Sequence, residues 1–343
     1  MIVVMSVSAA AEDVQQVAKA IEGQGLTPLV MPGGERTAVG IPSAIPPERR
    51  DELARLLESF PGVDHVAHVS RAYKLASREF HRADTIVSVR GVAIGGPAVQ
   101  VIAGPCAVES YEQLSAAALA VRAAGATMLR AGAFKPRTSP YAFQGLQEEG
   151  LHILKRVGAE TGLATVSEVM QPDLVELVAA HVDMLQIGAR NMQNFPLQIE
   201  AARAGRPVLL KRGPSAALDE FLLAAEYLLH HGNADVVLCE RGVHPLDRSY
   251  TRNTLDLNCV PVLKELSHLP LIVDPSHGIG VSRYVPAMAL AGLAAGADGL
   301  MIEVHPNPRE ALSDGPQSLN PAQFAALMRR LKPLAEAVGR RLA

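Results

Sequence analysis

Candidate metal-binding side chains lie far apart in the sequence, in its second quarter and near its end. Cys106 follows a Gly-Pro pair, His277 lies in Asp-Pro-Ser-His-Gly, and Glu303 and Asp314 come later. A thiolate, an imidazole and two carboxylates suit manganese, iron, cobalt or zinc, and this mixed donor set does not choose among them. His305 is an alternative to His277 because it shares a strand face with Glu303, but we prefer His277, where a strand should end in a turn. The residue types therefore predict a divalent metal site, provided that the fold brings these segments together.

A second group of candidate residues is cationic and follows short apolar runs. Its members are Arg130, Lys135, Arg137, Arg190, Lys211, Arg212 and Arg241. Gathering several unpaired cations in one buried place costs free energy, so anions must compensate their charges. Arginine and lysine side chains match phosphate and carboxylate groups, which indicates a substrate that carries such groups. An ion pair with a loop carboxylate is the alternative for any single member of the group.

The most specific short motif is Lys-Pro-Arg-Thr-Ser at residues 135–139. Pro136 restricts the backbone, so that Lys135 and Arg137 can face one ligand. Thr138 and Ser139 offer hydroxyl groups to a phosphate. We therefore expect this motif to bind part of an anionic substrate.

Three further residues could belong either to the site or simply to the structure. Glu168 ends an apolar run, where it either holds one of the cationic side chains or is an acidic residue at a helix N-terminus. Cys239 and Cys259 lie in a predicted strand and a predicted helix. We expect both cysteines to be buried apolar residues rather than ligands.

Eight short apolar runs between residues 99 and 304 would position these candidates. The runs span residues 99–104, 127–132, 164–169, 184–189, 206–213, 235–242, 270–277 and 299–304. Helix-like stretches follow them at 111–124, 143–161, 172–180, 194–204, 216–231, 254–266, 284–295 and 321–342. Buried parallel strands that alternate with helices predict an α/β fold, a closed (β/α)8 barrel of the TIM type, with its active site at the carboxyl ends of the strands. The first and last strands of a closed barrel are neighbours, so the four candidate metal ligands can converge.

The residues before the barrel, 1–73, show a different order of elements. Strands are predicted at 2–7, 27–31, 35–41 and 63–69, and helices at 11–24 and 46–59. This βαββαβ order is that of a small ferredoxin-like α+β domain. Residues 74–84 are charged and lack an apolar period, which predicts a linker before a barrel domain at 85–343. Alternating apolar residues at 85–96 predict a hairpin that closes the bottom of the barrel.

Composition excludes several classes of protein. The chain has 343 residues, 48% of them apolar, and a formal net charge of −3, which gives no overall attraction to nucleic acid or to an anionic membrane. No run reaches the ~18 apolar residues of a membrane span. The opening Met-Ile-Val-Val lacks a preceding basic region, and we interpret it as a strand rather than a secretory signal. Three cysteines indicate a reducing compartment, so we expect a cytoplasmic protein with no nucleic-acid or membrane partner.

Five sequence motifs together resemble those of one enzyme family. They are Gly-Pro-Cys-Ala-Val-Glu-Ser at 104–110, Arg-Ala-Gly-Ala-Phe-Lys-Pro-Arg-Thr-Ser at 130–139, Ile-Gly-Ala-Arg-Asn-Met-Gln-Asn at 187–194, Asp-Pro-Ser-His-Gly at 274–278 and Ser-Asp-Gly-Pro-Gln-Ser at 313–318. These motifs are similar to those of the type I beta 3-deoxy-D-arabino-heptulosonate 7-phosphate (DAHP) synthases, and the resemblance covers residues 85–343. The N-terminal order resembles the subgroup whose ferredoxin-like (ACT-like) extension is regulatory and senses aromatic amino acids.

The resemblance implies a transferase, 3-deoxy-7-phosphoheptulonate synthase. Such an enzyme condenses phosphoenolpyruvate with erythrose 4-phosphate in the first step of the shikimate pathway, which leads to chorismate and the aromatic amino acids. The implied metal ligands are Cys106, His277, Glu303 and Asp314. The implied phosphoenolpyruvate contacts are Arg130, Lys135, Glu168, Ala189, Arg190, Lys211 and Arg241, and the implied erythrose 4-phosphate contacts are Pro136, Arg137, Thr138 and Asp314. The resemblance also implies a homotetramer that is inhibited by tyrosine or phenylalanine bound to the small domain.

In the mechanism that we expect, a metal ion polarises the aldehyde oxygen and Lys135 donates a proton as the alkoxide forms. The enol carbon of phosphoenolpyruvate attacks the aldehyde, water adds to the cation-like centre, and phosphate leaves by carbon-oxygen cleavage. Glu168 and a metal-bound water are the candidates for activating the attacking water.

Three other functions fit parts of the pattern. A related synthase joins phosphoenolpyruvate to arabinose 5-phosphate, but it typically carries Lys-Ala-Asn-Arg-Ser-Ser where this chain has Lys-Pro-Arg-Thr-Ser. A Schiff-base aldolase would use Lys211 as its nucleophile. A non-catalytic amino-acid sensor would leave the charged barrel mouth without a role, so we favour the DAHP synthase.

Overall fold

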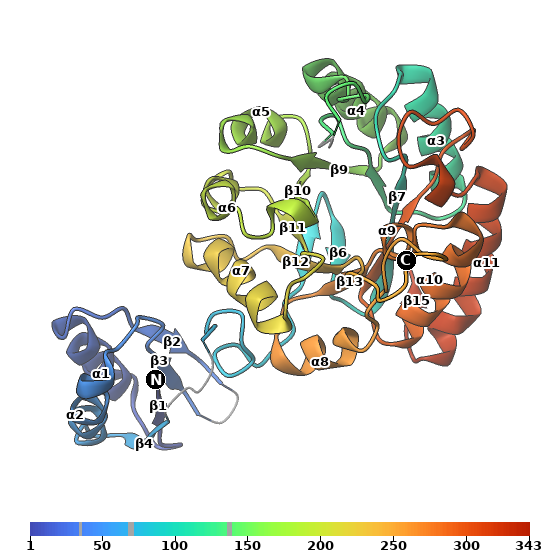
Figure 1. The fold of residues 1–343 in the computed structure, drawn as a ribbon. Coiled ribbons are helices and arrows are strands. Elements are labelled where there is room, and N and C mark those ends of the chain that lie inside the picture. The colour runs from blue at the N-terminus through green and yellow to red at the C-terminus, as the bar shows by residue number, and fades with distance from the viewer. Residues whose placement is uncertain (34–35, 68–71, 136–138) are drawn as a thin grey trace. The chain divides into compact units, whose positions relative to one another are not determined.

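The computed structural model describes residues 1–33, 36–67, 72–135 and 139–343, which fold into two compact units (Figure 1). The first unit spans Met1–Ala83 and the second spans Asp84–Ala343. Among the helices of these residues, none combines the length and the apolar character that crossing a bilayer requires.

In its described part, the first unit is a four-stranded antiparallel sheet with two helices. Its elements are β1 (Ile2–Met5), α1 (Ala11–Gly23), β2 (Leu29–Met31), β3 (Ala38–Gly40), α2 (Pro47–Glu58) and β4 (Val63–Ala67), and the strands lie in the order β2-β3-β1-β4. Val17 and Ile21 lie one turn apart on α1 and join Val3, Met5 and Leu57 in the core. The predicted βαββαβ order and ferredoxin-like class are confirmed.

The segment predicted as a linker, residues 74–84, begins on the first unit. Lys74 Nζ donates a hydrogen bond of 2.7 Å to the carbonyl oxygen of Pro42. The ring of Phe80 lies against Gly40, where any Cβ would overlap it. This segment therefore packs on the small sheet at both of these points, and the predicted domain boundaries stay predictions.

The second unit is a closed barrel of parallel strands with helices around it (Figure 1). Its strands are β7 (Ala98–Gly104), β8 (Met128–Arg130), β9 (Ala164–Val169), β10 (Met184–Ile187), β11 (Val208–Lys211), β12 (Val236–Glu240), β13 (Leu271–Val273) and β14 (Gly299–Glu303). Pairing of β14 with β7 closes the barrel and sets Glu303 beside Gly104. The predicted (β/α)8 class is confirmed.

Helices follow the strands of the second unit as the sequence predicts, and the short helix α9 comes in addition. They are α3 (Tyr111–Ala123), α4 (Gln147–Thr161), α5 (Val175–Ala179), α6 (Phe195–Arg203), α7 (Leu218–His230), α8 (Cys259–Leu266), α9 (Pro275–Ile279), α10 (Val285–Ala294) and α11 (Pro321–Ala337). Side-chain caps fix several starts: Ser110 Oγ accepts the backbone N–H of Gln113, and Asn320 Oδ1 accepts that of Gln323.

Several predicted ends are wrong, among them the start of the helix expected from residue 143, which begins at Gln147. The helix expected from residue 254 begins at Cys259, and the helix expected to reach residue 342 ends at Ala337 because Gly339 adopts a left-handed φ of 74°. Arg341–Leu342 instead forms the short strand β15 beside β7. Strand β13 ends at Val273, and the following residues form the one-turn helix α9 rather than a turn at the end of the strand.

A hairpin made of β5 (Val87–Val89) and β6 (Val92–Ile94) fills the interior of the barrel at its amino end. Val87, Val89 and Ile94 are fully buried and pack in one cluster with Met128 and Met184, the first residues of β8 and β10, and Val92 is partly buried against it. The prediction that this hairpin closes the bottom of the barrel is confirmed. The opposite end of the barrel, where its strands finish, carries the candidate functional residues.

Candidate active site

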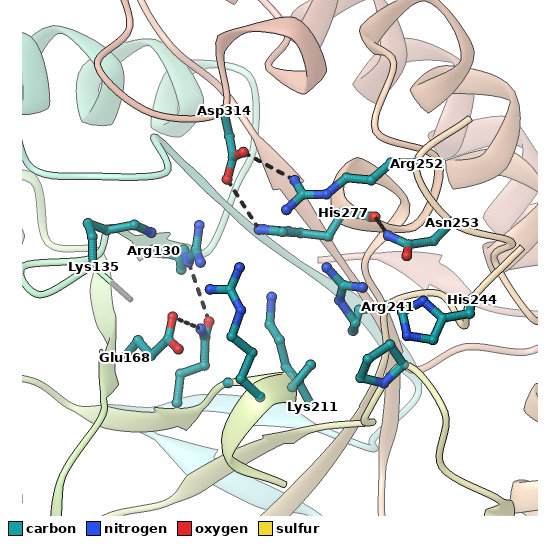
Figure 2. Close-up of a pocket in the computed structure, with 15 residues that line it drawn as sticks. Arg130, Lys135, Glu168, Lys211, Arg241, His244, Arg252, Asn253, His277 and Asp314 are labelled. Carbon is teal, nitrogen blue, oxygen red and sulfur yellow. Dashed lines mark hydrogen bonds and ion pairs between the residues drawn. The ribbon is translucent and has the colours of Figure 1, made fainter. Parts of the chain in front are cut away.

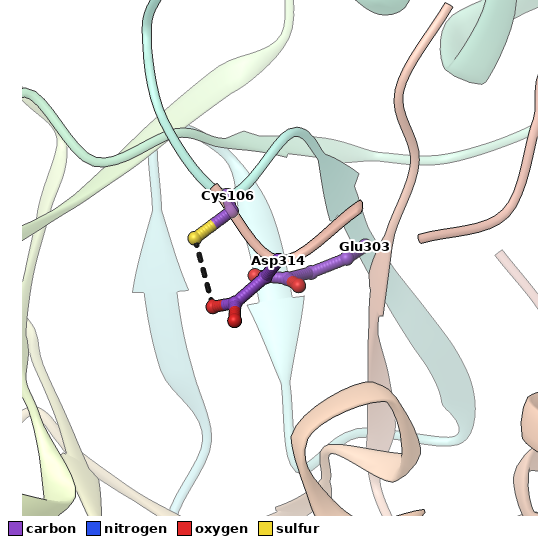
Figure 3. Close-up of side chains that lie close together, drawn as sticks. All are labelled: Cys106, Glu303 and Asp314. Carbon is purple, nitrogen blue, oxygen red and sulfur yellow. Dashed lines mark hydrogen bonds between the residues drawn. The ribbon is translucent and has the colours of Figure 1, made fainter. Parts of the chain in front are cut away.

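Three of the predicted metal ligands meet where the first and last barrel strands adjoin. Cys106 lies two residues after β7, Glu303 ends β14, and Asp314 precedes the 3-10 turn η4 (Gly315–Gln317). Their ligand atoms all lie within 4.8 Å of one another (Figure 3). Cys106 Sγ is 3.2 Å from Asp314 Oδ2. Barrel closure therefore brings together residues that are widely separated in the sequence.

His277 approaches the same group from α9. Its Nε2 lies 3.4 Å from Glu303 Oε1 and 4.0 Å from Asp314 Oδ2. The alternative residue, His305, is engaged elsewhere, because its Nε2 lies 3.2 Å from Glu109 Oε2. The structure thus places His277 beside the other three candidate ligands.

The chemistry of this group fits a divalent transition metal, since sulfur, imidazole nitrogen and carboxylate oxygen donors are all present. Burial, together with the charge of Glu303, raises the pKa of the Cys106 thiol to about 11, and a bound cation would counter both effects. Burial lowers the pKa of His277, which favours the neutral imidazole that metal binding requires. Burial alone would raise the pKa of Asp314, yet His277 and Arg252 hold it below its ordinary value.

A cavity of about 260 Å³ opens beside this group at the carboxyl ends of the strands (Figure 2). The predicted site residues in its wall are Arg130, Lys135, Glu168, Ala189, Arg190, Lys211, Arg241, His277 and Asp314. Gln186, Gly188, Pro214, His244, Arg252 and Asn253 complete the wall. Cationic side chains outnumber carboxylates there, so the cavity attracts anions. We call Cys106, His277, Glu303 and Asp314, the four candidate ligands, the metal-ligand group. His277 and Asp314 belong both to this group and to the wall of the cavity.

Arg130 connects the cavity to the metal-ligand group. Its side chain is 2% exposed, its Nη1 donates to Glu303 Oε1 at 2.7 Å, and its Nε donates to Gln186 Oε1 at 3.3 Å. Gln186 Nε2 donates in turn to Glu168 Oε2 at 3.2 Å. Burial alone would lower the pKa of Arg130, but the Glu303 carboxylate raises it, so the guanidinium stays charged. Glu168 is thus joined to a cation of the cavity through Gln186.

Asp274 connects a second cation of the cavity to the same group. This buried carboxylate accepts a hydrogen bond from Lys211 Nζ at 2.6 Å, and it caps α9 by accepting the backbone N–H of His277 at 2.9 Å. Its Oδ2 also lies 2.8 Å from His277 Nδ1, although this contact does not meet hydrogen-bond geometry. Burial would raise the pKa of Asp274, but His277 and Lys211 hold it well below its ordinary value. Asp274 therefore compensates Lys211 and positions the imidazole.

Lys135 reaches the cavity from the loop after β8. Its Nζ donates a hydrogen bond of 3.0 Å to the carbonyl oxygen of Cys106, beside the metal-ligand group. The next three predicted site residues, Pro136, Arg137 and Thr138, lie outside the described residues, so their roles stay predictions.

Arg212 does not line the cavity, contrary to the grouping made from its charge. Its Nη1 donates to Glu240 Oε2 at 3.0 Å and to Asp256 Oδ2 at 2.8 Å. Successive side chains of a strand point to opposite faces, so Lys211 enters the barrel while Arg212 faces the surrounding layer. The ion-pair alternative is therefore the correct one for Arg212.

The two other cysteines are buried, as predicted. Cys239 belongs to the barrel interior, and Cys259 Sγ on α8 lies 3.6 Å from Glu240 Oε2. Burial raises the pKa of both thiols.

Several polar residues of the site are absent from the sequence-based set. They are Gln186, His244, Arg252, Asn253, Asp274 and Gln317. Gln186 interrupts an apolar strand run, which is a signal that could have drawn attention to it. Arg252 and Asn253 lie in a long loop, where the sequence gives no periodicity from which to infer their direction.

The class of protein that this fold and this site define is a (β/α)8-barrel enzyme with a candidate metal site beside a cation-lined cavity. Residues 81–339 match the DAHP synthetase I family, and residues 1–71 match the DAHP synthase ferredoxin-like domain. The chain belongs to the DAHP synthase family. It is therefore a transferase of aromatic amino acid biosynthesis.

Individual relatives agree with this assignment. Phospho-2-dehydro-3-deoxyheptonate aldolase of Thermotoga maritima is 44% identical over 339 residues, which cover 99% of each chain. The crystal structure of that DAHP synthase has a TM-score of 0.79 and 43% identity, and covers 100% of this chain and 99% of its own. A 2-dehydro-3-deoxyphosphooctonate aldolase of Nitratidesulfovibrio vulgaris is 32% identical over 252 residues, 68% of this chain and 91% of its own.

Proposed function

We propose that this chain condenses phosphoenolpyruvate with erythrose 4-phosphate at the carboxyl end of its barrel, giving DAHP and inorganic phosphate. The observation that carries the proposal is that His277 and Asp314 belong both to the metal-ligand group and to the cation-lined cavity. Such an arrangement lets one substrate bind by its anionic groups while the aldehyde of the other lies beside the metal-ligand group.

The four-carbon sugar is favoured over arabinose 5-phosphate by two observations. The similarity to the deoxyheptonate aldolase extends over nearly the whole chain, whereas that to the deoxyphosphooctonate aldolase covers 68% of it. The motif at residues 135–139 is Lys-Pro-Arg-Thr-Ser, as expected for the heptulosonate enzymes.

The DAHP synthase family is metal-dependent, and we propose that Cys106, His277, Glu303 and Asp314 together hold one divalent ion of manganese, iron, cobalt or zinc. Such an ion would act as a Lewis acid toward the sugar aldehyde. Asp274 and Arg130 support this role because they contact His277 and Glu303.

The cavity residues bind phosphoenolpyruvate in this proposal. Its phosphate and carboxylate are held by the cationic residues Arg130, Lys135, Arg190, Lys211 and Arg241, and Glu168 and Ala189 are further contacts of the substrate. The sugar phosphate is held by Pro136, Arg137 and Thr138, with Asp314 at the sugar. Burial lowers the pKa of Arg241, so a substrate anion beside it would restore its preference for the charged form.

Carbon-carbon bond formation joins the enol carbon of phosphoenolpyruvate to the aldehyde carbon. Lys135 Nζ donates a proton to the aldehyde oxygen as the bond forms. Water then adds to the carbon that carries the phosphate and passes one proton to a base. The resulting hemiketal phosphate collapses: phosphate departs with the carbon-oxygen bonding electrons, and the hydroxyl group gives its proton to the departing phosphate as the ketone of DAHP forms. Glu168 is our candidate for this base, since Gln186 fixes its carboxylate in the cavity wall.

The remaining expectations concern regulation and assembly. We propose that residues 1–73 bind tyrosine or phenylalanine as the inhibitory effector, that residues 74–84 are the linker, and that the enzyme is a cytoplasmic homotetramer. Deletion of residues 1–80 should preserve catalysis and abolish inhibition. Inhibition that survives the deletion would refute the role of the small domain.

The test of function is phosphate release from phosphoenolpyruvate with each sugar. We expect turnover with erythrose 4-phosphate, far less with arabinose 5-phosphate, loss after chelation, and recovery on adding a divalent metal. Preference for arabinose 5-phosphate would assign the related synthase instead. Absence of turnover with both sugars after metal addition would favour the sensor, and trapping of Lys211 with substrate by sodium borohydride would establish a Schiff-base aldolase.

A further inference from the structure

The loop after β12 contacts one candidate carboxylate ligand of the metal directly and the other through Gln317. Arg252 Nη1 donates a hydrogen bond to Asp314 Oδ1 at 3.1 Å (Figure 2). The same Nη1 donates to Gln317 Oε1 at 2.9 Å. Gln317 Nε2 then donates to Glu303 Oε2 at 2.6 Å. One guanidinium group is thereby connected directly to Asp314 and, through Gln317, to Glu303.

The same loop holds the helix that carries His277. Asn253 Nδ2 donates a hydrogen bond of 2.8 Å to the carbonyl oxygen of His277. The backbone N–H of Arg252 donates to the carbonyl oxygen of Ile279 at 2.9 Å. The Arg252 side chain lies against Gly280, the left-handed residue that ends α9, where a Cβ would overlap it. Both the middle and the end of α9 are thus attached to this loop.

The loop itself has a fixed base on the barrel. Val243 and Thr254 exchange both of their backbone hydrogen bonds, each 2.9 Å long. Glu240, buried at the end of β12, accepts the backbone N–H of Gly242 at 2.6 Å and that of Asp256 at 3.3 Å. The arginine therefore extends from a loop whose two ends are bonded to each other and to the barrel.

Arg252 contacts one side of the Asp314 carboxylate. Its backbone has a φ of 53°, a left-handed conformation that residues other than glycine adopt rarely. Its two carboxylate oxygens have different partners, with Oδ1 bonded to Arg252 and Oδ2 facing Cys106. Loss of the Arg252 contact would leave Oδ1 without this partner and the carboxylate held only from the side of Oδ2.

We propose that Arg252 is a positioning residue that sets the geometry of the metal site before substrate binds. It does so by holding Asp314 directly and Glu303 through Gln317. This inference rests on the proposed function, because it takes the four candidate ligands to bind a divalent ion. Loss of a partner that orients a metal ligand typically weakens metal binding roughly 10- to 100-fold.

Arg252 also lines the cavity, which raises the competing role of a direct substrate contact. The two roles make different predictions. A positioning residue changes metal affinity in the absence of substrate, whereas a direct contact changes the KM of a substrate and leaves metal affinity alone.

The experiment measures metal binding by the full-length apoprotein without substrate. Arg252→Ala, Arg252→Gln, Arg252→Lys and Gln317→Leu are titrated with Mn²⁺ by calorimetry and with Cd²⁺ by the ultraviolet absorption of the cadmium–thiolate bond. Arg156→Ala is the matched control, because Arg156 forms an exposed ion pair with Glu160 on α4. Circular dichroism and thermal midpoints report folding, and steady-state kinetics at saturating metal separate kcat from KM.

We expect Mn²⁺ and Cd²⁺ to bind roughly 10- to 100-fold more weakly to Arg252→Ala and Arg252→Gln, with partial recovery in Arg252→Lys. Gln317→Leu should weaken binding in the same direction, while Arg156→Ala should match the parent. If Arg252→Ala does not fold, the lysine variant and Gln317→Leu decide the question.

Unchanged metal affinity with a raised substrate KM would overturn the proposal in favour of a direct contact. Unchanged affinity with a lowered thermal midpoint would overturn it in favour of a purely structural role. If the parent protein turned over both substrates and bound metal normally, either result would leave the proposed function intact. A parent protein that binds neither Mn²⁺ nor Cd²⁺ would overturn both the role of Arg252 and the proposed metal-dependent function.

Discussion

Arg130 and Glu303 form a buried ion pair, with Nη1 and Oε1 2.7 Å apart, that joins β8 to β14. Their side chains are 2% and 1% exposed, so water does little to screen either charge. Glu303 is a candidate metal ligand and Arg130 a candidate contact for the substrate anion. A metal ion at Glu303 would weaken the hold of this carboxylate on Arg130 and leave the guanidinium better able to bind phosphoenolpyruvate.

Replacing Glu303 by glutamine should destabilise the metal-free barrel, because Arg130 keeps its charge and loses its buried partner. Breaking such a pair typically costs about 3–5 kcal/mol. Urea unfolding of the parent and variant apoproteins gives the difference directly, and Glu160→Gln, which breaks an exposed pair with Arg156, is the control. A decrease in the free energy of unfolding no larger than that of the control would show that water compensates the charge of Arg130.

Gly188→Ala should displace Glu168 from its hydrogen bond with Gln186. A Cβ at position 188 would overlap Glu168 Oε1, which faces the glycine from β9. Misplacing a group in the cavity wall should lower kcat/KM roughly 10- to 100-fold. The control is Gly96→Ala in the same unit, where a Cβ meets nothing within 4 Å. Unchanged kinetics would exclude a role for the position of Glu168.

Asp274→Asn should weaken metal binding and disturb the cavity together. The neutral amide no longer compensates Lys211, and it removes the negative charge beside His277 Nδ1. Metal titration should show roughly 10- to 100-fold weaker binding, and the KM for phosphoenolpyruvate should change as well. The exposed Asp173→Asn serves as control. A variant that retains metal affinity would show that the imidazole needs no carboxylate to hold it.

None of the three cysteines should react quickly with a disulfide reagent in the folded, metal-free protein at about pH 8. Burial raises the pKa of Cys106 to about 11 and raises those of Cys239 and Cys259. Each thiol keeps its proton below its raised pKa, and the thiolate is the reactive form. Absorbance assays before and after denaturation should show slow and then fast labelling. Fast labelling of the native protein would contradict the buried placement.

The barrel could be predicted from the sequence because buried parallel strands appear as apolar runs at a steady spacing. Convergence of Cys106 with Glu303 followed from topology alone, since the first and last strands of a closed barrel must adjoin. The ferredoxin-like class of the small domain could likewise be predicted from the order of its strands and helices.

The side-chain network within the site was not accessible in the same way. Arg212 shares the charge and neighbourhood of Lys211 but faces outward, and its direction depends on where β11 ends. Asp274 caps α9, so the residues after β13, where we expected a turn at the end of the strand, form a helix instead. Arg252 reaches Asp314 only because several long-range hydrogen bonds fix its loop, and sequence periodicity carries no information about such bonds.

The pairing of β7 with β14 also determines the order in which parts of the protein can fold during translation. The ribosome delivers Cys106 well before β14, the partner strand of β7, and β15, which pairs with the start of β7, follows later still. The small N-terminal unit can fold while the rest is still being synthesised, because its sheet needs nothing beyond its own residues. The candidate active site is therefore complete only after β14 has been made, and a nascent chain that stalls short of Glu303 can hold a folded N-terminal unit without an assembled active site.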